Sequence, residues 1–154
     1  MHIESYLEMV HDSEKELGEA FMKVAEHHKS EPDIYFTCQL LSSWSEEQTE
    51  KIKAQEKRHA KSVKKSKEPE RLRQTLFKEP RKGSLAMIRD LQDLWILTKE
   101  VEIGCSILLQ AAAALRDMEL KATFENLDQL NKRQSEWLLT RIKQAAPEIL
   151  VVAE

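Results

Sequence analysis

The sequence predicts an all-α protein, a four-helix bundle that runs up-down-down-up as a single domain over residues 1–154. Of the 154 residues 41% are hydrophobic and 33% charged, but only 3 are Gly and 4 are Pro, so turn-forming residues are scarce. Apolar residues recur in steps of three and four along four segments, which is typical of helices with one buried face. One stretch, about residues 60–83, loses this pattern and contains Pro69 and Pro80.

The first two helices are predicted at about residues 3–28 and 31–59. Between them, Ser30 is the predicted N-cap of the second helix, Pro32 fits its first turn, and Asp33 reaches back as in a capping box. The apolar stripe of the first helix is Ile3, Leu7, Val10, Leu17, Phe21 and Val24, and that of the second is Ile34, Cys38, Leu41 and Ile52.

The third and fourth helices follow the crossover at 60–83, which also holds a possible short helix over residues 70–77. Ser84 is the predicted N-cap of the third helix, the phase of the pattern shifts near residues 116–119, and the fourth helix is expected to end before Pro147. Short connections make each pair an antiparallel hairpin, and the long link lets the third helix run parallel to the second. The third stripe is Ile88, Leu91, Trp95, Cys105, Leu109 and Ala112, and the fourth is Leu120, Phe124, Leu127, Leu138, Ile142 and Ala145.

Composition and motifs exclude several functional classes. No apolar run reaches the 18 or more residues of a membrane span, and no leader sequence is expected. Cys38 and Cys105 fall in apolar patterns, so we interpret them as reduced core thiols of a cytoplasmic protein. A Ser/His/Asp or Cys/His arrangement, a Gly-rich phosphate loop and a Cys-x-x-Cys motif are all missing from the sequence.

Polar residues interrupt every one of the four apolar stripes. A buried carboxylate is costly unless it is paired, hydrogen-bonded or metal-bound. In each half of the chain an inward Glu is followed, on the next helix, by a Gln with a small polar residue three positions before it. This repetition predicts one polar layer in the middle of the bundle, made of Glu14, Ser45, Gln48, Glu102, Asn131 and Gln134.

With one long crossover and two inward Glu residues, the chain resembles the ferritin-like superfamily, most closely its rubrerythrin-type branch. In that family the first and third helices each give a Glu, the second and fourth each give Glu-x-x-His, and together they bind two irons. Glu14 and Glu102 match the first pair. The resemblance covers nearly the whole chain outside the crossover.

Both Glu-x-x-His motifs are absent from this chain. Gln48 and Gln134 stand where the motif Glu would be, and Lys51 and Trp137 stand where its His would be. We therefore interpret the layer as a degenerate metal site, now a Glu–Gln hydrogen-bond network that needs no cofactor. The alternative is an atypical di-iron or di-manganese site, which would add ligands to Glu14 and Glu102 from among Glu46, Glu47, Glu50 and Glu136. An error in the assumed helix phase is the third possibility.

A strongly basic stretch runs from Lys57 to Lys82, where eleven Lys or Arg stand against three Glu, a local charge of +8 that leaves −11 for the rest of a chain of net charge −3. Its first part could bind phosphates or an anionic membrane surface. It lacks the interleaved aromatic residues of a nucleic-acid site, so we expect instead a solvated helix end attracted to acidic faces of this protein or of a neighbouring subunit. The candidate anion patch is Lys57, Arg58, Lys61, Lys64, Lys65 and Lys67.

Two further features are weaker indications. His27 and His28 with Glu31 could form a surface metal site, although solvated helix-end residues are the simpler reading. Trp44 and Trp137 lie beside the main stripes, where aromatic residues can form a dimer contact. The sequence thus predicts a non-catalytic ferritin-like bundle, a homodimer that acts as a binding or stress-associated accessory protein. The rival hypotheses are a carboxylate di-metal oxidase and a polyanion-binding bundle; no ligand is identified and no membrane or nucleic-acid partner is expected.

Overall fold

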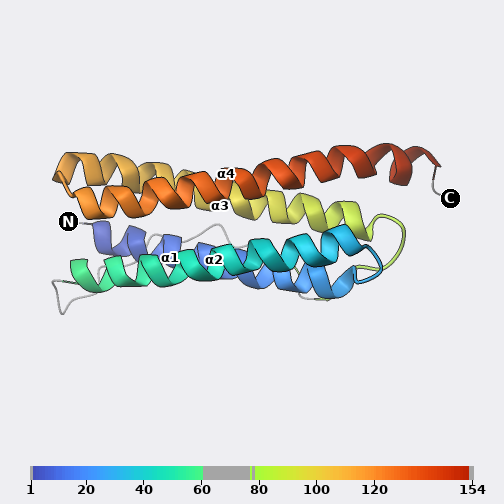
Figure 1. The fold of residues 1–154 in the computed structure, drawn as a ribbon, viewed down its shortest axis with the longest axis horizontal. Helices are drawn as coiled ribbons and strands as arrows, with labels where there is room; N and C mark the ends of the chain where they lie inside the picture. The colour runs from blue at the N-terminus through green and yellow to red at the C-terminus, as the bar shows by residue number, and fades with distance from the viewer. Residues whose placement is uncertain (1, 61–76, 78, 153–154) are drawn as a thin grey trace.

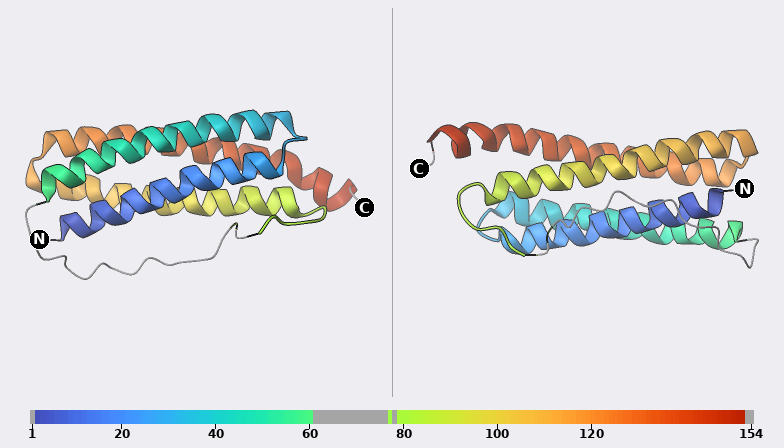
Figure 2. Two further views of the ribbon diagram at one scale, coloured as in Figure 1. Left: turned by 90° about the horizontal axis from the view of Figure 1, so that it is seen from below. Right: turned by 180° about the vertical axis from the view of Figure 1, so that it is seen from behind.

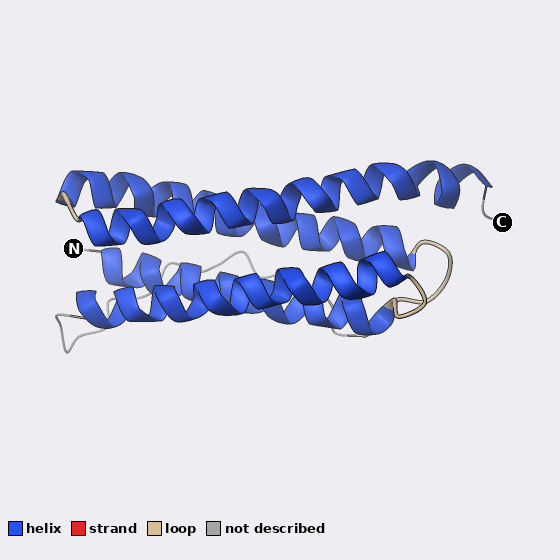
Figure 3. Cartoon of the chain, viewed as in Figure 1, coloured by secondary structure: helices blue, strands red, loops and turns tan. Residues whose placement is uncertain are grey.

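The computed structural model describes residues 2–60, 77 and 79–152. Within them four helices pack against one another, and no strand is present (Figure 3). The prediction of an all-α, four-helix protein is confirmed. The helices are α1 (Ile3–His27), α2 (Pro32–His59), α3 (Ala86–Leu115) and α4 (Met118–Pro147), followed by a short π-helical turn at Glu148–Val152. None of these helices combines the length and the apolarity that crossing a membrane requires.

The four helices form two antiparallel hairpins that lie along each other. In Figure 1, α1 and α4 run in one direction along the bundle, and α2 and α3 run in the other. The closest packing is between α1 and α2 and between α3 and α4, with α1 against α3 next and α2 against α4 more loosely packed. The last turns of α4 extend beyond the ends of the other helices (Figures 1 and 2).

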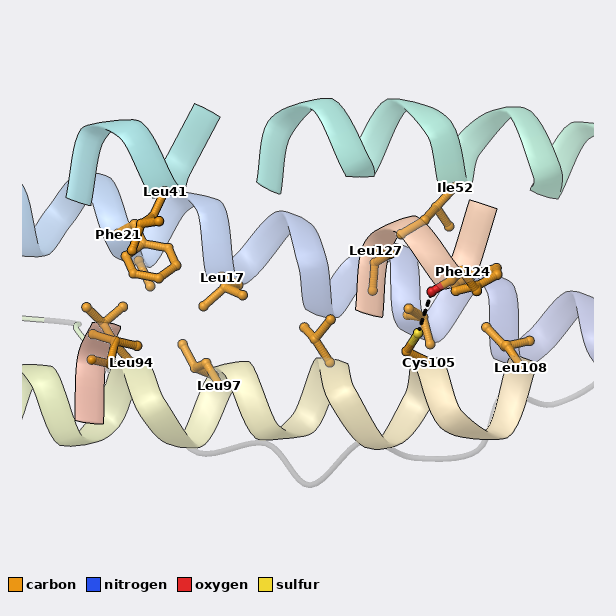
Figure 4. Packing of buried hydrophobic residues seen from close by; sticks show 14 of the residues in the cluster. Leu17, Phe21, Leu41, Ile52, Leu94, Leu97, Cys105, Leu108, Phe124 and Leu127 are labelled. Atoms are coloured by element: carbon orange, nitrogen blue, oxygen red, sulfur yellow. Dashed lines mark hydrogen bonds between the residues drawn. The ribbon is translucent and has the colours of Figure 1, made fainter. Parts of the chain in front are cut away.

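The apolar stripes of the four helices meet in one core. Figure 4 shows Phe21 on α1 beside Leu41 on α2, with Leu94 on α3 below them. Each such side chain is fully or almost fully buried, and burying one contributes roughly 1.5–3 kcal/mol. The thiol of Cys105 donates to the carbonyl oxygen of Phe124 at 3.1 Å, which ties α3 to α4 inside this core (Figure 4). Both cysteines are buried and free, as predicted.

The predicted helix starts were close, but the predicted N-caps were wrong. The N-cap positions are held by Glu31 and Leu85 rather than by Ser30 and Ser84, and neither side chain makes a capping hydrogen bond. Pro32 does occupy the first turn of α2. Asp33 forms no capping box, because its carboxylate accepts instead from the guanidinium Nε of Arg141 on α4 at 2.6 Å.

The turn between α3 and α4 lies where the phase shift placed it and contains no glycine. Arg116 takes the left-handed conformation with φ 52°, which a non-glycine residue adopts only at some cost. Asp117 is a true N-cap, since its carboxylate accepts from the N–H of Leu120 at 3.1 Å. The predicted end before Pro147 was wrong: the backbone stays helical through Glu148, with φ −66° and ψ −45°, and into the π-helical turn.

The tight contact between α1 and α3 depends on a glycine. A Cβ atom at Gly104 would lie 2.6 Å from Cγ2 of Val10, far inside normal van der Waals contact. Packed cores accept such overpacking only by shifting side chains or backbone. Gly104 therefore sets how closely the two hairpins approach.

We expect Gly104→Ala to lower the free energy of unfolding by about 1–3 kcal/mol, the usual range for overpacking a core. Urea denaturation measures the loss. The double variant Val10→Ala/Gly104→Ala should lose less than the sum of the two single variants, because the clashing methyl group is gone. Ser106→Ala, on the exposed face of the same helix, serves as the control. Strict additivity of the two core changes would contradict the proposed contact.

Candidate functional site

Five of the six residues of the predicted polar layer do point into the bundle. Their exposed fractions lie between 0% and 2%, and they come from α1, α2 and α4: Glu14, Ser45, Gln48, Asn131 and Gln134. From α3 the fully buried polar side chain is Thr98, whose hydroxyl donates to the carbonyl oxygen of Trp95 at 2.6 Å. The layer therefore contains one carboxyl group rather than two.

The sixth predicted residue, Glu102, is not part of the buried layer. Its side chain is 27% exposed, and its carboxylate pairs with the ammonium group of Lys99 at 2.7 Å. The buried face of α3 includes Leu91, Cys105 and Ala112 of the predicted stripe, but it also includes residues one position earlier than predicted, Leu94, Val101 and Leu108. Apolar residues stand at both phases of this helix, so its pattern alone did not decide between them; a charged Glu102 next to Lys99 is better solvated at the edge.

A chain of hydrogen bonds links three helices across the layer. The side-chain amide of Gln134 on α4 donates to the hydroxyl of Ser45 on α2 at 2.9 Å, and also to the carbonyl oxygen of Leu41 at 3.0 Å. The Ser45 hydroxyl in turn donates to the carboxyl of Glu14 on α1. We call this chain, Gln134–Ser45–Glu14, the relay. The predicted contact between Gln and carboxylate is thus mediated by Ser45, while Gln48 donates elsewhere, to Asn126 at 3.0 Å.

The environment of Glu14 favours its neutral form. Burial in the core raises the pKa of Glu14 to about 7, and the hydrogen bond from Ser45 opposes this only in part. Near neutral pH a substantial fraction of the carboxyl groups is therefore protonated. No Lys, Arg or His of the described chain forms an ion pair with Glu14.

Several polar atoms of the layer have no hydrogen-bond partner among the described residues. They are Oε2 of Glu14, Oε1 of Gln48, and both Oδ1 and Nδ2 of Asn131. Most buried polar groups in proteins are hydrogen-bonded, so such a concentration in one layer is unusual. The middle of the bundle is therefore a polar site whose hydrogen-bonding atoms are not all paired by the described residues.

The residues present do not fit a di-iron or di-manganese centre. The carboxylates that the alternative would add, Glu46, Glu47, Glu50 and Glu136, are all exposed on the outer faces of α2 and α4. Lys51, at the position of a ligating His, pairs with Glu47 at 3.3 Å. Over the described residues, no three or more His, Cys, Asp or Glu side chains gather as a metal-binding group. One carboxyl group with neutral amides and a hydroxyl is a poor donor set for such ions.

The histidines at the end of α1 were expected to be solvated rather than to bind a surface metal, but His28 is engaged by other contacts. Nε2 of His28 lies 2.8 Å from Oδ2 of Asp90 on α3, and Oδ1 of Asp90 accepts from Arg81 at 2.7 Å. Burial acts to raise the pKa of Asp90, but the hydrogen bonds and charges of His28 and Arg81 outweigh it, and the pKa is lowered. Sequence reasoning missed Asp90, although its spacing of four from Ala86 and from Leu94 places it on the buried stripe of α3.

Of the two residues of the anion patch that the structure describes, Arg58 turns toward the protein itself. Arg58 donates through Nη2 to Oδ1 of Asp117 at 2.6 Å, and Nε2 of His59 lies 2.9 Å from Oδ2 of the same carboxylate. Lys57 is exposed. The remaining residues of the predicted anion patch, Lys61, Lys64, Lys65 and Lys67, lie outside the described residues, as does most of the possible short helix at 70–77.

Aromatic side chains border the layer on the side where α2 and α4 face each other. The guanidinium group of Arg133 on α4 lies over the ring of Trp44 on α2, 4.7 Å from its centroid. Trp44 and Trp137 are both half-buried. On α2, Phe36 and Leu40 are 66% and 53% exposed, which is unusual for large apolar side chains spaced to share a helix face.

Comparisons of the chain with protein-family models, with curated proteins and with solved structures found no match.

We expect Glu14→Gln to stabilise the protein at pH 8 and to flatten its dependence on pH. Since the pKa of Glu14 rises from 4.5 to about 7 on folding, the unfolded chain ionises first, and stability falls as pH rises between these values. The shift corresponds to roughly 3 kcal/mol lost above pH 7 and to none below pH 4. Urea denaturation from pH 4 to pH 8 measures it. Glu16→Gln, half-buried on the same helix, is the control; an unchanged pH profile in the Glu14 variant would contradict the assignment.

Proposed function

We propose that this protein is a non-catalytic bundle of ferritin-like layout whose former metal layer is now a hydrogen-bond network, and that it acts as a cytoplasmic binding or stress-associated accessory protein. The observation that carries the proposal is the relay. The carboxyl group of Glu14, the one carboxyl group of this layer among the described residues, is bound by a serine hydroxyl, which accepts from a glutamine amide. Such a network satisfies a carboxyl group without any cation.

The ferritin-like layout is supported by the arrangement of the helices. A long link between the second and third helices, with those two helices parallel, is the feature that sets this layout apart from bundles with short loops or with two long links. Fold is poor evidence for function, so the chemistry of the layer has to decide. In the layer, the absence of both Glu-x-x-His motifs and the outward position of Glu102 both argue against an oxidase.

The binding role is supported by the face of α2 next to α4. Exposed Phe36 and Leu40 lie beside the half-buried Trp44, and large aromatic and aliphatic side chains of this kind are enriched in the cores of protein interfaces. We propose that this face, made of Phe36, Leu40 and Trp44, is the contact of a homodimer. We call it the α2 aromatic face.

Metal analysis tests the non-catalytic assignment. Protein purified after growth with added iron and manganese should contain well under one metal per chain, because the layer offers a single carboxyl group, a substantial fraction of which is neutral near pH 7. Elemental analysis by mass spectrometry measures it. Glu14→Gln, prepared in the same way, reports any metal bound adventitiously at the surface. About two metals per chain in the wild type, lost in the variant, would establish the oxidase alternative.

Oligomeric state tests the α2 aromatic face. We expect the wild type to sediment as a dimer and Leu40→Lys to sediment as a monomer, because a buried, unpaired ammonium group is strongly unfavourable at an interface. Analytical ultracentrifugation over a range of concentrations measures this. Ile103→Lys, at an exposed apolar position on α3, is the matched control. A monomeric wild type, or a control that dissociates equally, would rule out this face as the dimer contact.

A further inference from the structure

The polar layer has more buried acceptors than the protein supplies donors for. Three oxygen atoms, Oε2 of Glu14, Oε1 of Gln48 and Oδ1 of Asn131, accept no hydrogen bond from the described residues, and the amide nitrogen of Asn131 donates none. The three side chains are 1–2% exposed, so bulk solvent does not reach them. Leaving a buried polar group unpaired costs about 1–3 kcal/mol, which is large against a total stability of about 5–15 kcal/mol.

The helix directions bring these atoms to one side of the relay. Gln48 lies three residues after Ser45 on α2, and Asn131 lies three residues before Gln134 on α4. Because α2 and α4 run in opposite directions, these two steps lead toward the same end of the bundle (Figure 1). Glu14 joins them from α1 through its hydrogen bond with Ser45. The unpaired atoms therefore share one level of the core.

The donors and acceptors among the unpaired atoms indicate which kind of ligand fits at this level of the core. A bare cation would satisfy the three oxygens but could not accept from the Asn131 amide. Exchanging the oxygen and nitrogen of that amide changes nothing, since both are unpaired. Water both donates and accepts, and buried waters typically make about three hydrogen bonds to groups of this kind. Because one water donates two hydrogens, the three acceptors present when Glu14 is ionised require more than one molecule.

We propose that the layer holds a cluster of buried water molecules that bridges Asn131 to Glu14 and Gln48. This proposal rests on the proposed function only in taking the layer to be a hydrogen-bond network. The cluster extends the relay to every polar side chain of the layer. It also serves both forms of Glu14, since water donates to the carboxylate and accepts from the neutral carboxyl group.

A high-resolution crystal structure of chelator-treated protein tests the proposal. We expect separate density peaks about 2.7–3.0 Å from Oε2 of Glu14, Oε1 of Gln48 and the amide of Asn131. In solution, NMR cross-relaxation with water should show long-lived contacts to the side-chain amide of Asn131. The amide of the exposed Asn126 is the internal control and should show only rapidly exchanging solvent.

A variant of Asn131 separates the water cluster from general effects on folding. Asn131→Leu replaces the amide by an apolar group of similar size, so we expect the nearest density peak and the long-lived contacts at Gln48 to disappear while the helices persist by circular dichroism. An empty layer with no long-lived water contacts would overturn the water cluster and leave the proposed function standing. A single peak about 2.0–2.6 Å from the oxygens, with an anomalous signal, would overturn both.

Discussion

The polar middle of the bundle is organised around the cost of burying the carboxyl group of Glu14. Glu14 lies on the core face of α1, where losing its hydration raises its pKa to about 7. An apolar residue at this position would carry no such cost. With Glu14 present, hydrogen bonds from the surrounding polar groups have to offset the lost hydration. Ser45 does so directly, and Gln134 does so through Ser45. The position of these three residues on three helices makes the relay a constraint on how α1, α2 and α4 align.

The polar character of the layer continues along the contact between α2 and α4. These two helices pack together less closely than the partners within each hairpin, and besides their shared apolar core they are joined by polar pairs along their length. Such pairs contribute little to net stability but favour one register, because a shift by one turn would break all of them at once. The pairs are Asp33–Arg141, Ser45–Gln134, Gln48–Asn126, Gln55–Glu119 and Arg58–Asp117. By contrast, α1 and α3 meet through Gly104 and Val10, where close packing sets the distance.

The sequence predicted the buried face of a helix well wherever its apolar residues fit only one helical phase. On α1, α2 and α4 the apolar residues select one face, and Glu14, Gln48 and Gln134 were placed correctly from spacing alone. On α3, Leu94 and Trp95, and again Leu108 and Leu109, allow two phases, so Glu102 was placed inward when it lies at the edge. The contact between Asp33 and Arg141 joins residues 108 apart and overrides the local capping rule. Local patterns carry no information about such tertiary partners.

Two aspartates, Asp117 and Asp90, connect the two hairpins at the two ends of the long link. Where the chain leaves α2, Arg58 and His59 bind Asp117 at the start of α4. Where the chain approaches α3, Arg81 binds Asp90 and Asp93, and Asp90 also binds His28 at the end of α1. Each contact joins residues of one hairpin to residues of the other or of the link, and the lowered pKa values of Asp90 and Asp117 follow from these partners despite burial. The alignment that the relay requires in the middle of the bundle is thus fixed independently at its two ends.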